Sequence, residues 1–182
     1  MANINLEALQ AALPSVLMAP KDGAPIEQLC LRPEIGARNF VEEMELTRDH
    51  GIPGERWNYA PWLALEDGRA DPRIQVSILS KRVLDLVYND PENMVHPGDS
   101  FIADMDFSYE NLPDGTLLNI GSAVLRVSDK FNTACQKWKD RYGQDALRWI
   151  VLPNNRKYRL RGVLCEVIKD GRVKTGDKIL KA

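Results

Sequence analysis

The sequence has few of the residues that build metal cages or disulfide frameworks. Its 182 residues include three cysteines and two histidines. No two cysteines lie closer than 30 positions apart, and no Cys-x-x-Cys motif occurs. Structural zinc sites and small disulfide-rich domains depend on closely spaced Cys or His residues. Neither kind of site is therefore expected here.

An excess of charge is also missing. Lys and Arg number 24 against 26 Asp and Glu, so the net charge is −2. Domains that bind nucleic acid usually carry a strong basic excess, and we therefore expect no nucleic-acid partner. No apolar run approaches the length that spans a bilayer, and the segment 1–20 lacks the basic start of a signal peptide. We expect a cytoplasmic protein without a membrane partner.

The two commonest phosphate-binding loops, G-x-x-x-x-G-K-[ST] and G-x-G-x-x-G, do not occur either. What remains is an ordinary globular composition, with 44% hydrophobic and 27% charged residues. The length suits one domain with a terminal extension. We place the extension at residues 1–25 and the domain at residues 26–182.

Cys135 is the most informative residue that is present. Thr133 and Gln136 form a capping-box pattern, which predicts that a helix begins here with Cys135 in its first turn. Free backbone N–H groups and the helix dipole favour a thiolate at that position, and Lys137 and Lys139 add positive charge nearby. A thiolate could act as a nucleophile or as a metal ligand. The alternative is a buried cysteine that packs as a small hydrophobe.

The other residues with potential chemistry are weaker candidates. Cys165 alternates with valines on one strand face and is expected in the core, and Cys30 lies between two leucines. His50 and His96 are flanked by loop residues and are expected at the surface. Asp104 and Asp106 alternate along a strand and could hold Mg²⁺, although paired acids at a strand end are more often solvated.

Hydrophobic periodicity and turn residues indicate many short strands and few helices. We predict a helix over 5–13 that ends at Pro14, a second helix that begins after Ser80, and a third over 145–150. The Cys135 helix is expected to end at Gly143. Strands are expected at 26–32, 41–47, 73–79, 101–103, 116–120, 122–127, 159–168 and 172–179, the last two joined as a hairpin at Asp170-Gly171. The segment 51–71 reads as a long ordered loop. This pattern favours a mainly β protein with helices (α+β), an antiparallel barrel or sandwich.

The order of several segments resembles the MOSC family, which is named from the C-terminal domain of molybdenum-cofactor sulfurases and also occurs as small stand-alone bacterial-type proteins. The resemblance spans roughly residues 26–180. The segments that carry it are Gly51–Trp57, Val76–Ser80, His96–Ile102, Leu112–Thr116, Ile120-Gly121, Cys135–Trp138, Arg161–Val163 and Arg172–Asp177. The family's cysteine falls on Cys135, the residue that the capping pattern also selects.

This resemblance implies an antiparallel MOSC-type β-barrel decorated by short helices. It also implies a molybdenum cofactor, a pterin that holds the metal through sulfur. Cys135 would then be the catalytic residue, either as a molybdenum ligand or as the carrier of a persulfide sulfur. The resemblance does not decide between these two roles.

The resemblance also implies which residues bind the cofactor. They are Arg56, Gly98, Asp99, Ser100, Lys137 and Arg161. The cations Arg56, Lys137 and Arg161 are the candidates for its phosphate, because guanidinium and ammonium groups suit that anion. The sequence departs from the family at Glu55 and Trp57, where Asp and His are usual, and at Ser100, where Asn is usual. A third hypothesis is therefore a divergent barrel that binds another anion.

Two functions follow from the resemblance. The first is the catalytic component of a reductase that acts on N-hydroxylated compounds. The alternative is a non-catalytic carrier that delivers sulfur or cofactor to partner enzymes. Because the sequence contains no desulfurase or electron-transfer domain, we expect either function to need an external electron donor or a cysteine desulfurase as partner.

Overall fold

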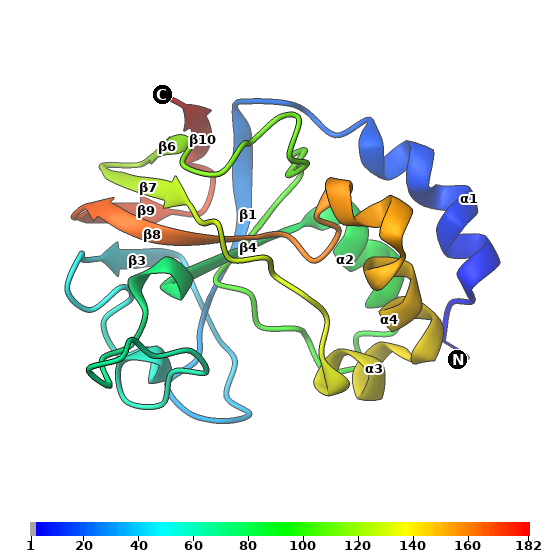
Figure 1. Cartoon of the computed structure of the whole chain (residues 1–182), viewed down its shortest axis with the longest axis horizontal. Coiled ribbons are helices and arrows are strands. Elements are labelled where there is room, and N and C mark those ends of the chain that lie inside the picture. The colour runs from blue at the N-terminus through cyan, green and yellow to red at the C-terminus, as the bar shows by residue number, and fades with distance from the viewer. Residues whose placement is uncertain (1–2) are drawn as a thin grey trace.

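A closed β-barrel forms the centre of the molecule in this computed structural model, which describes residues 3–182 (Figure 1). Neighbouring strands around the barrel are β1 (Ala24–Leu31), β5 (Phe101–Ala103), β4 (Val76–Ser80), β8 (Val163–Lys169), β7 (Ala123–Val127), β6 (Leu117–Ile120) and β10 (Lys178–Lys181). The barrel closes because β10 also pairs with β1. The strand β2 (Asn39–Val41) extends the edge of β1, and β3 (Glu43–Leu46) pairs separately with β9 (Gly171–Lys174).

The barrel is mixed, which corrects the expectation of an antiparallel one. All its pairs are antiparallel except β4–β5, in which Ile78 lies opposite Phe101 in a parallel register. Parallel neighbours need a crossover connection, and α2 (Lys81–Val87) forms part of the one between these two strands. The predicted β-barrel with short helices is otherwise confirmed.

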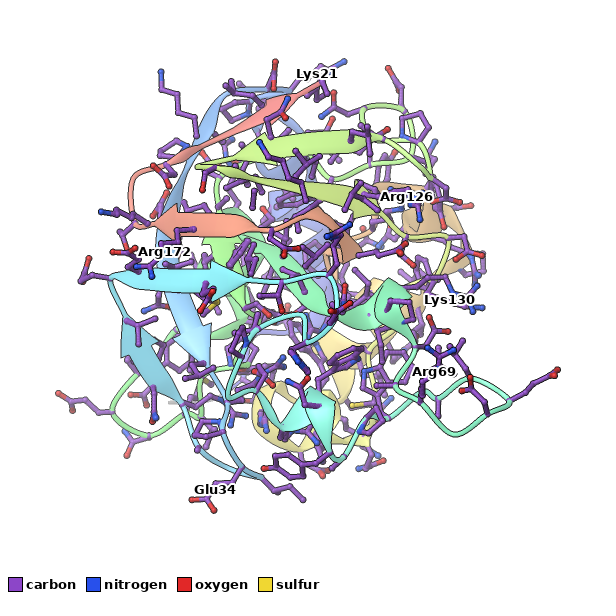
Figure 2. The ribbon with its side chains drawn as sticks, turned by 90° about the vertical axis from the view of Figure 1, so that its left-hand side faces the viewer. Lys21, Glu34, Arg69, Arg126, Lys130 and Arg172 are labelled. Carbon is purple, nitrogen blue, oxygen red and sulfur yellow. The ribbon has the colours of Figure 1, made fainter. Side chains whose placement is uncertain are left out.

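Side-chain alternation along the strands fills the barrel interior. Ile78, Phe101 and Leu125 are fully buried there. Cys165 belongs to the same core, as predicted, while Cys30 is buried in β1. Charged side chains such as Arg126 and Arg172 lie around the outside of the barrel (Figure 2).

The helices gather on one side of the barrel and enclose a second apolar core (Figure 1). They are α1 (Leu6–Leu17), α2, α3 (Gln136–Tyr142) and α4 (Gln144–Val151). Short 3-10 helices occupy Arg56–Asn58 (η1), Pro72–Ile74 (η2) and Pro153–Tyr158 (η3). None of the helices in residues 3–182 is long and apolar enough to cross a membrane.

The first helix is longer than predicted, because it does not end at Pro14. It begins after Asn5, whose side chain accepts a hydrogen bond from the Ala8 N–H at 2.9 Å, and it continues to Leu17. Proline removes one helical hydrogen bond, but Leu9 and Val16 on either side of it are buried against the second core. Packing therefore outweighs the local preference of proline.

Two strand predictions also need correction. The expected strand over 41–47 is divided between β2 and β3, which belong to different sheets. The predicted hairpin at Asp170-Gly171 does not form, since β8 pairs with β4 and β7 whereas β9 pairs with β3. Gly171 lacks the positive φ that a two-residue hairpin turn needs, and the Asp170 carboxylate accepts hydrogen bonds from Arg48 instead.

Candidate functional site

Cys135 lies at the start of α3, but not in its first turn. It is the N-cap residue, and the helix begins at Gln136. The predicted capping box is wrong because the Gln136 amide donates to Asp140 at 2.6 Å, an i,i+4 pair within the helix. Ala134, which the capping box would place inside the helix, precedes it.

The three cysteines differ sharply in exposure. Cys135 is exposed, whereas Cys30 and Cys165 are buried. Burial raises the pKa of the Cys30 thiol to about 11 and that of Cys165 to about 12, so both stay protonated at neutral pH. Cys135 is therefore the cysteine whose thiol can react with or bind a group from solvent.

An ion pair between Arg161 and Asp99 lies next to this helix. Nη1 of Arg161 donates to both Asp99 carboxylate oxygens, at 2.7 and 2.8 Å. The guanidinium also lies over the Trp138 ring, with its central carbon 4.7 Å from the ring centroid. Asn132 donates to the Arg161 carbonyl at 2.9 Å. The structure thus brings Asp99 and Arg161 together against α3, although 62 positions separate them in the sequence.

A tight turn before β8 presents Arg161 to this position. Arg159 has a left-handed φ of 47°, and its carbonyl accepts a hydrogen bond from the Gly162 N–H. A Cβ on Gly162 would lie 1.9 Å from the Ile78 carbonyl oxygen, so only glycine fits this approach. The Arg159 guanidinium is buried over the Tyr109 ring and anchors the turn.

A hydrogen bond between Gly98 and His96 fixes the backbone immediately before Asp99. The Gly98 N–H donates to Nδ1 of His96 at 3.1 Å, and the His96 ring packs nearly perpendicular to the rings of Phe40 and Tyr88. The expectation of a surface histidine is wrong: His96 is 7% exposed. Burial lowers its pKa to about 4, against an opposing effect from Asp99.

Two arginines beside this segment were not predicted from the sequence. Nε of Arg38 donates to the His96 carbonyl at 3.0 Å, and Nη1 of Arg141 donates to the Pro97 carbonyl at 3.2 Å. No motif marks either residue in the sequence. Their placement depends on backbone carbonyls that lie more than 40 positions away along the chain.

The remaining predicted site residues are more dispersed. Ser100 is fully buried and exchanges hydrogen bonds with Ser77, so its hydroxyl joins β5 to β4. Lys137 is exposed on α3, and its side chain forms no hydrogen bond or ion pair within residues 3–182. The Arg56 side chain, in η1, makes a single long hydrogen bond within the described residues, at 3.5 Å to the Ala60 carbonyl.

The loop residues that depart from the family pattern are buried. Glu55 is 1% exposed, and one of its oxygens accepts two hydrogen bonds from Arg32 while the other has no partner within the described chain. Trp57 packs with Ile74 and Leu164 in a small cluster of its own. Both side chains therefore contribute to folding the loop.

The acidic pair considered for Mg²⁺ is used in structural contacts. Asp104 pairs with Arg82 at 2.6 Å, and Asp106 accepts from the Ser108 N–H at 2.8 Å. Residues 3–182 contain no group of three or more His, Cys, Asp or Glu side chains placed to hold a metal ion.

Comparison with known families identifies the part of the chain that contains the candidate site. Residues 91–180 match the family model of the MOSC domain, a range that includes Asp99, Cys135 and Arg161. The chain belongs to the MOSC domain family. The match extends from the segment before β5 to β10, and α1 to α2 lie outside it.

Solved structures resemble this MOSC protein over most of its chain. YuaD from Bacillus subtilis has a TM-score of 0.61 and 19% identity, over 86% of this chain and 93% of its own. YiiM from Escherichia coli has a TM-score of 0.56 and 17% identity, over 87% and 69% of the two chains. At these identities the likeness establishes the fold alone. Comparison with curated protein sequences gives no match.

Proposed function

We propose that this MOSC protein binds the molybdenum cofactor and that Cys135 is the protein's ligand to the metal. The observation that carries the proposal is the placement of the exposed Cys135 at the start of α3, three residues before Trp138, the ring over which the paired Arg161 lies. A thiolate is a soft ligand of the kind that suits a metal already bound by sulfur. Cationic groups near it suit an anionic cofactor.

The donor set of the site fits that cofactor. Cys135 offers one thiolate, and the cofactor's own sulfurs would complete a sulfur-rich coordination shell. Arg161 is held in place by a carboxylate that is itself 1% exposed, so its position is fixed before a ligand arrives. The other cations that the family resemblance suggests are held less firmly: Arg56 makes one long hydrogen bond, and the Lys137 side chain makes none within residues 3–182.

When bound, the cofactor would supply a two-electron redox centre. We propose that the protein is the catalytic component of a reductase that converts an N-hydroxylated compound, with two electrons and two protons, into the reduced amine-type product and water. The electrons would come from an external donor. In this function Cys135 binds the centre, while Asp99 orients Arg161 and Trp138 covers one face of its guanidinium.

Turnover tests the reductase function against the carrier alternative, since an exposed cysteine suits both. Protein purified from a cofactor-competent host is assayed for reduction of an N-hydroxylated amidine with a flavoprotein or iron–sulfur donor system. The reductase function predicts turnover that Cys135→Ser abolishes. No turnover, together with a sulfane sulfur on Cys135 detected by mass after incubation with a cysteine desulfurase and cysteine, would instead support the carrier.

A further inference from the structure

Within residues 3–182, the Arg38 side chain makes hydrogen bonds to backbone carbonyl groups and to no other acceptor. Its guanidinium donates to the carbonyls of His96 at 3.0 Å, Ala37 at 2.8 Å and Pro97 at 3.4 Å. The approach is close because the residue beneath it is Gly98, where a Cβ would lie 2.4 Å from Nε of Arg38. These three bonds leave two of the five guanidinium N–H donors of Arg38 unused.

Arg141 brings a second positive charge to the same place. Its Nη1 donates to the Pro97 carbonyl, which also accepts from Arg38. Neither arginine forms an ion pair with a carboxylate within residues 3–182, whereas the neighbouring Arg32 and Arg161 are paired with Glu55 and Asp99. Burial and the charge of Arg141 lower the pKa of Arg38 below its ordinary value. The carbonyl groups offset part of the repulsion between the two guanidinium groups, but no carboxylate within residues 3–182 neutralises either charge.

Two partly buried like charges that share one acceptor are unfavourable unless an anion joins them. A tetrahedral dianion would accept the unused N–H donors of both groups and cancel their charge, and guanidinium geometry matches phosphate oxygens. We propose that Arg38 and Arg141 form the binding site for the phosphate group of an organic phosphate monoester. Arg38 lies outside the segment that matches the family model.

The surroundings favour a phosphate that carries an organic group. Phe40, whose ring contacts His96, and Val95 are each 52% exposed beside the arginines, and both offer apolar surface. Arg141 lies six residues after Cys135 on α3, about 9 Å along a helix axis. The inference thus deepens the proposed function, on which the identity of the ligand rests. It assigns the phosphate end of the cofactor to Arg38 and Arg141, with Cys135 toward the metal end.

Titration calorimetry of the metal-free protein with phenyl phosphate, inorganic phosphate and benzenesulfonate tests this site. We expect phenyl phosphate to bind saturably and at least as tightly as inorganic phosphate, and the singly charged sulfonate to bind more weakly. Arg38→Gln and Arg141→Gln should each weaken phenyl phosphate binding by about tenfold or more. Arg38→Lys, which keeps the charge, should recover part of the loss.

Arg126→Gln, on the outer face of β7, is the matched control and should bind as the wild type does (Figure 2). Circular dichroism of each variant confirms that it is folded. Unchanged affinity in folded Arg38→Gln and Arg141→Gln, or no phosphate binding by the wild type, would overturn the site. Cys135→Ser should keep phosphate binding, so that failure of the anion site is distinct from failure of metal ligation. Tighter binding of inorganic phosphate than of phenyl phosphate would overturn the choice of a monoester.

Discussion

At the scale of single residues, the site depends on groups whose roles are set by distant parts of the chain. Asp99 and Arg161 form one partly buried pair across 62 positions of sequence, and the resemblance to the family named both. Arg38 and Arg141 could not be found in this way. An isolated arginine in a polar segment has no pattern that reveals which backbone carbonyls it will meet.

Gly98→Ala tests whether the missing side chain makes room for Arg38. The new Cβ would displace the guanidinium from its carbonyl partners, and alanine is strained at this φ of 80°, so we expect a loss of about 1–2 kcal/mol in unfolding free energy and weaker phenyl phosphate binding. Gly68→Ala is the matched control, because Gly68 has a similar φ of 85° but nothing within 4 Å of the added atom. Equal losses in the two variants, measured by urea unfolding, would contradict the steric role of Gly98.

His96 makes stability depend on pH. Its pKa is about 4 in the folded protein against 6.5 ordinarily, so the unfolded chain binds more protons between these values. The contribution of neutral His96 is fully present above pH 6.5 and is lost as the pH falls to 4. We expect unfolding free energy to drop by roughly 3 kcal/mol over this range.

The variant His96→Asn distinguishes the pH dependence caused by His96 from that caused by Asp and Glu side chains. Asn can still accept the Gly98 N–H but does not titrate, so the variant should show a shallower pH dependence between pH 6.5 and 4. Urea unfolding at several pH values measures the slope. The same slope in the variant and the wild type would show that other groups cause it.

At the scale of elements, most strands follow from alternating side chains and turn residues. The helix at 145–150 and the end of α3 at Gly143 were also predictable from local sequence. The parallel β4–β5 pair and the separation of β8 from β9 were not, because neighbouring strands are chosen by the whole barrel. The start of α3 was misplaced for a local reason, since Gln136 has a better partner one turn ahead in Asp140.

Pro14→Ala should stabilise the protein. Proline inside α1 removes a hydrogen bond and crowds the preceding turn, so its replacement is expected to raise the unfolding free energy by about 1–3 kcal/mol. Pro153→Ala is the control, because Pro153 occupies the first position of η3, where proline is tolerated. Thermal unfolding of both variants measures the difference. If Pro14→Ala were no more stable than the wild type, this would contradict the view that packing keeps α1 helical at Pro14 against the destabilising effect of proline.

At the scale of the whole molecule, pairing of the barrel strands places segments that are distant in the sequence next to α3. The loop after β1, the approach to β5, and the turn before β8 each contribute one part of the site. The sequence predicted the barrel and its cysteine through the family resemblance. The pairing of Asp99 with Arg161, and the presence of Arg38 and Arg141 beside them, emerged only when these segments were placed together.

The central claim is that Cys135 binds the molybdenum of the cofactor. Its most direct test is the molybdenum and pterin content of protein purified from a cofactor-competent host, compared among the wild type, Cys135→Ser and Cys165→Ala. Cys165 is a matched thiol in the barrel core and should be dispensable for the metal. We expect the wild type and Cys165→Ala to carry molybdenum and Cys135→Ser to lose most of it. A wild type without molybdenum, or a serine variant that retains it fully, would contradict the account.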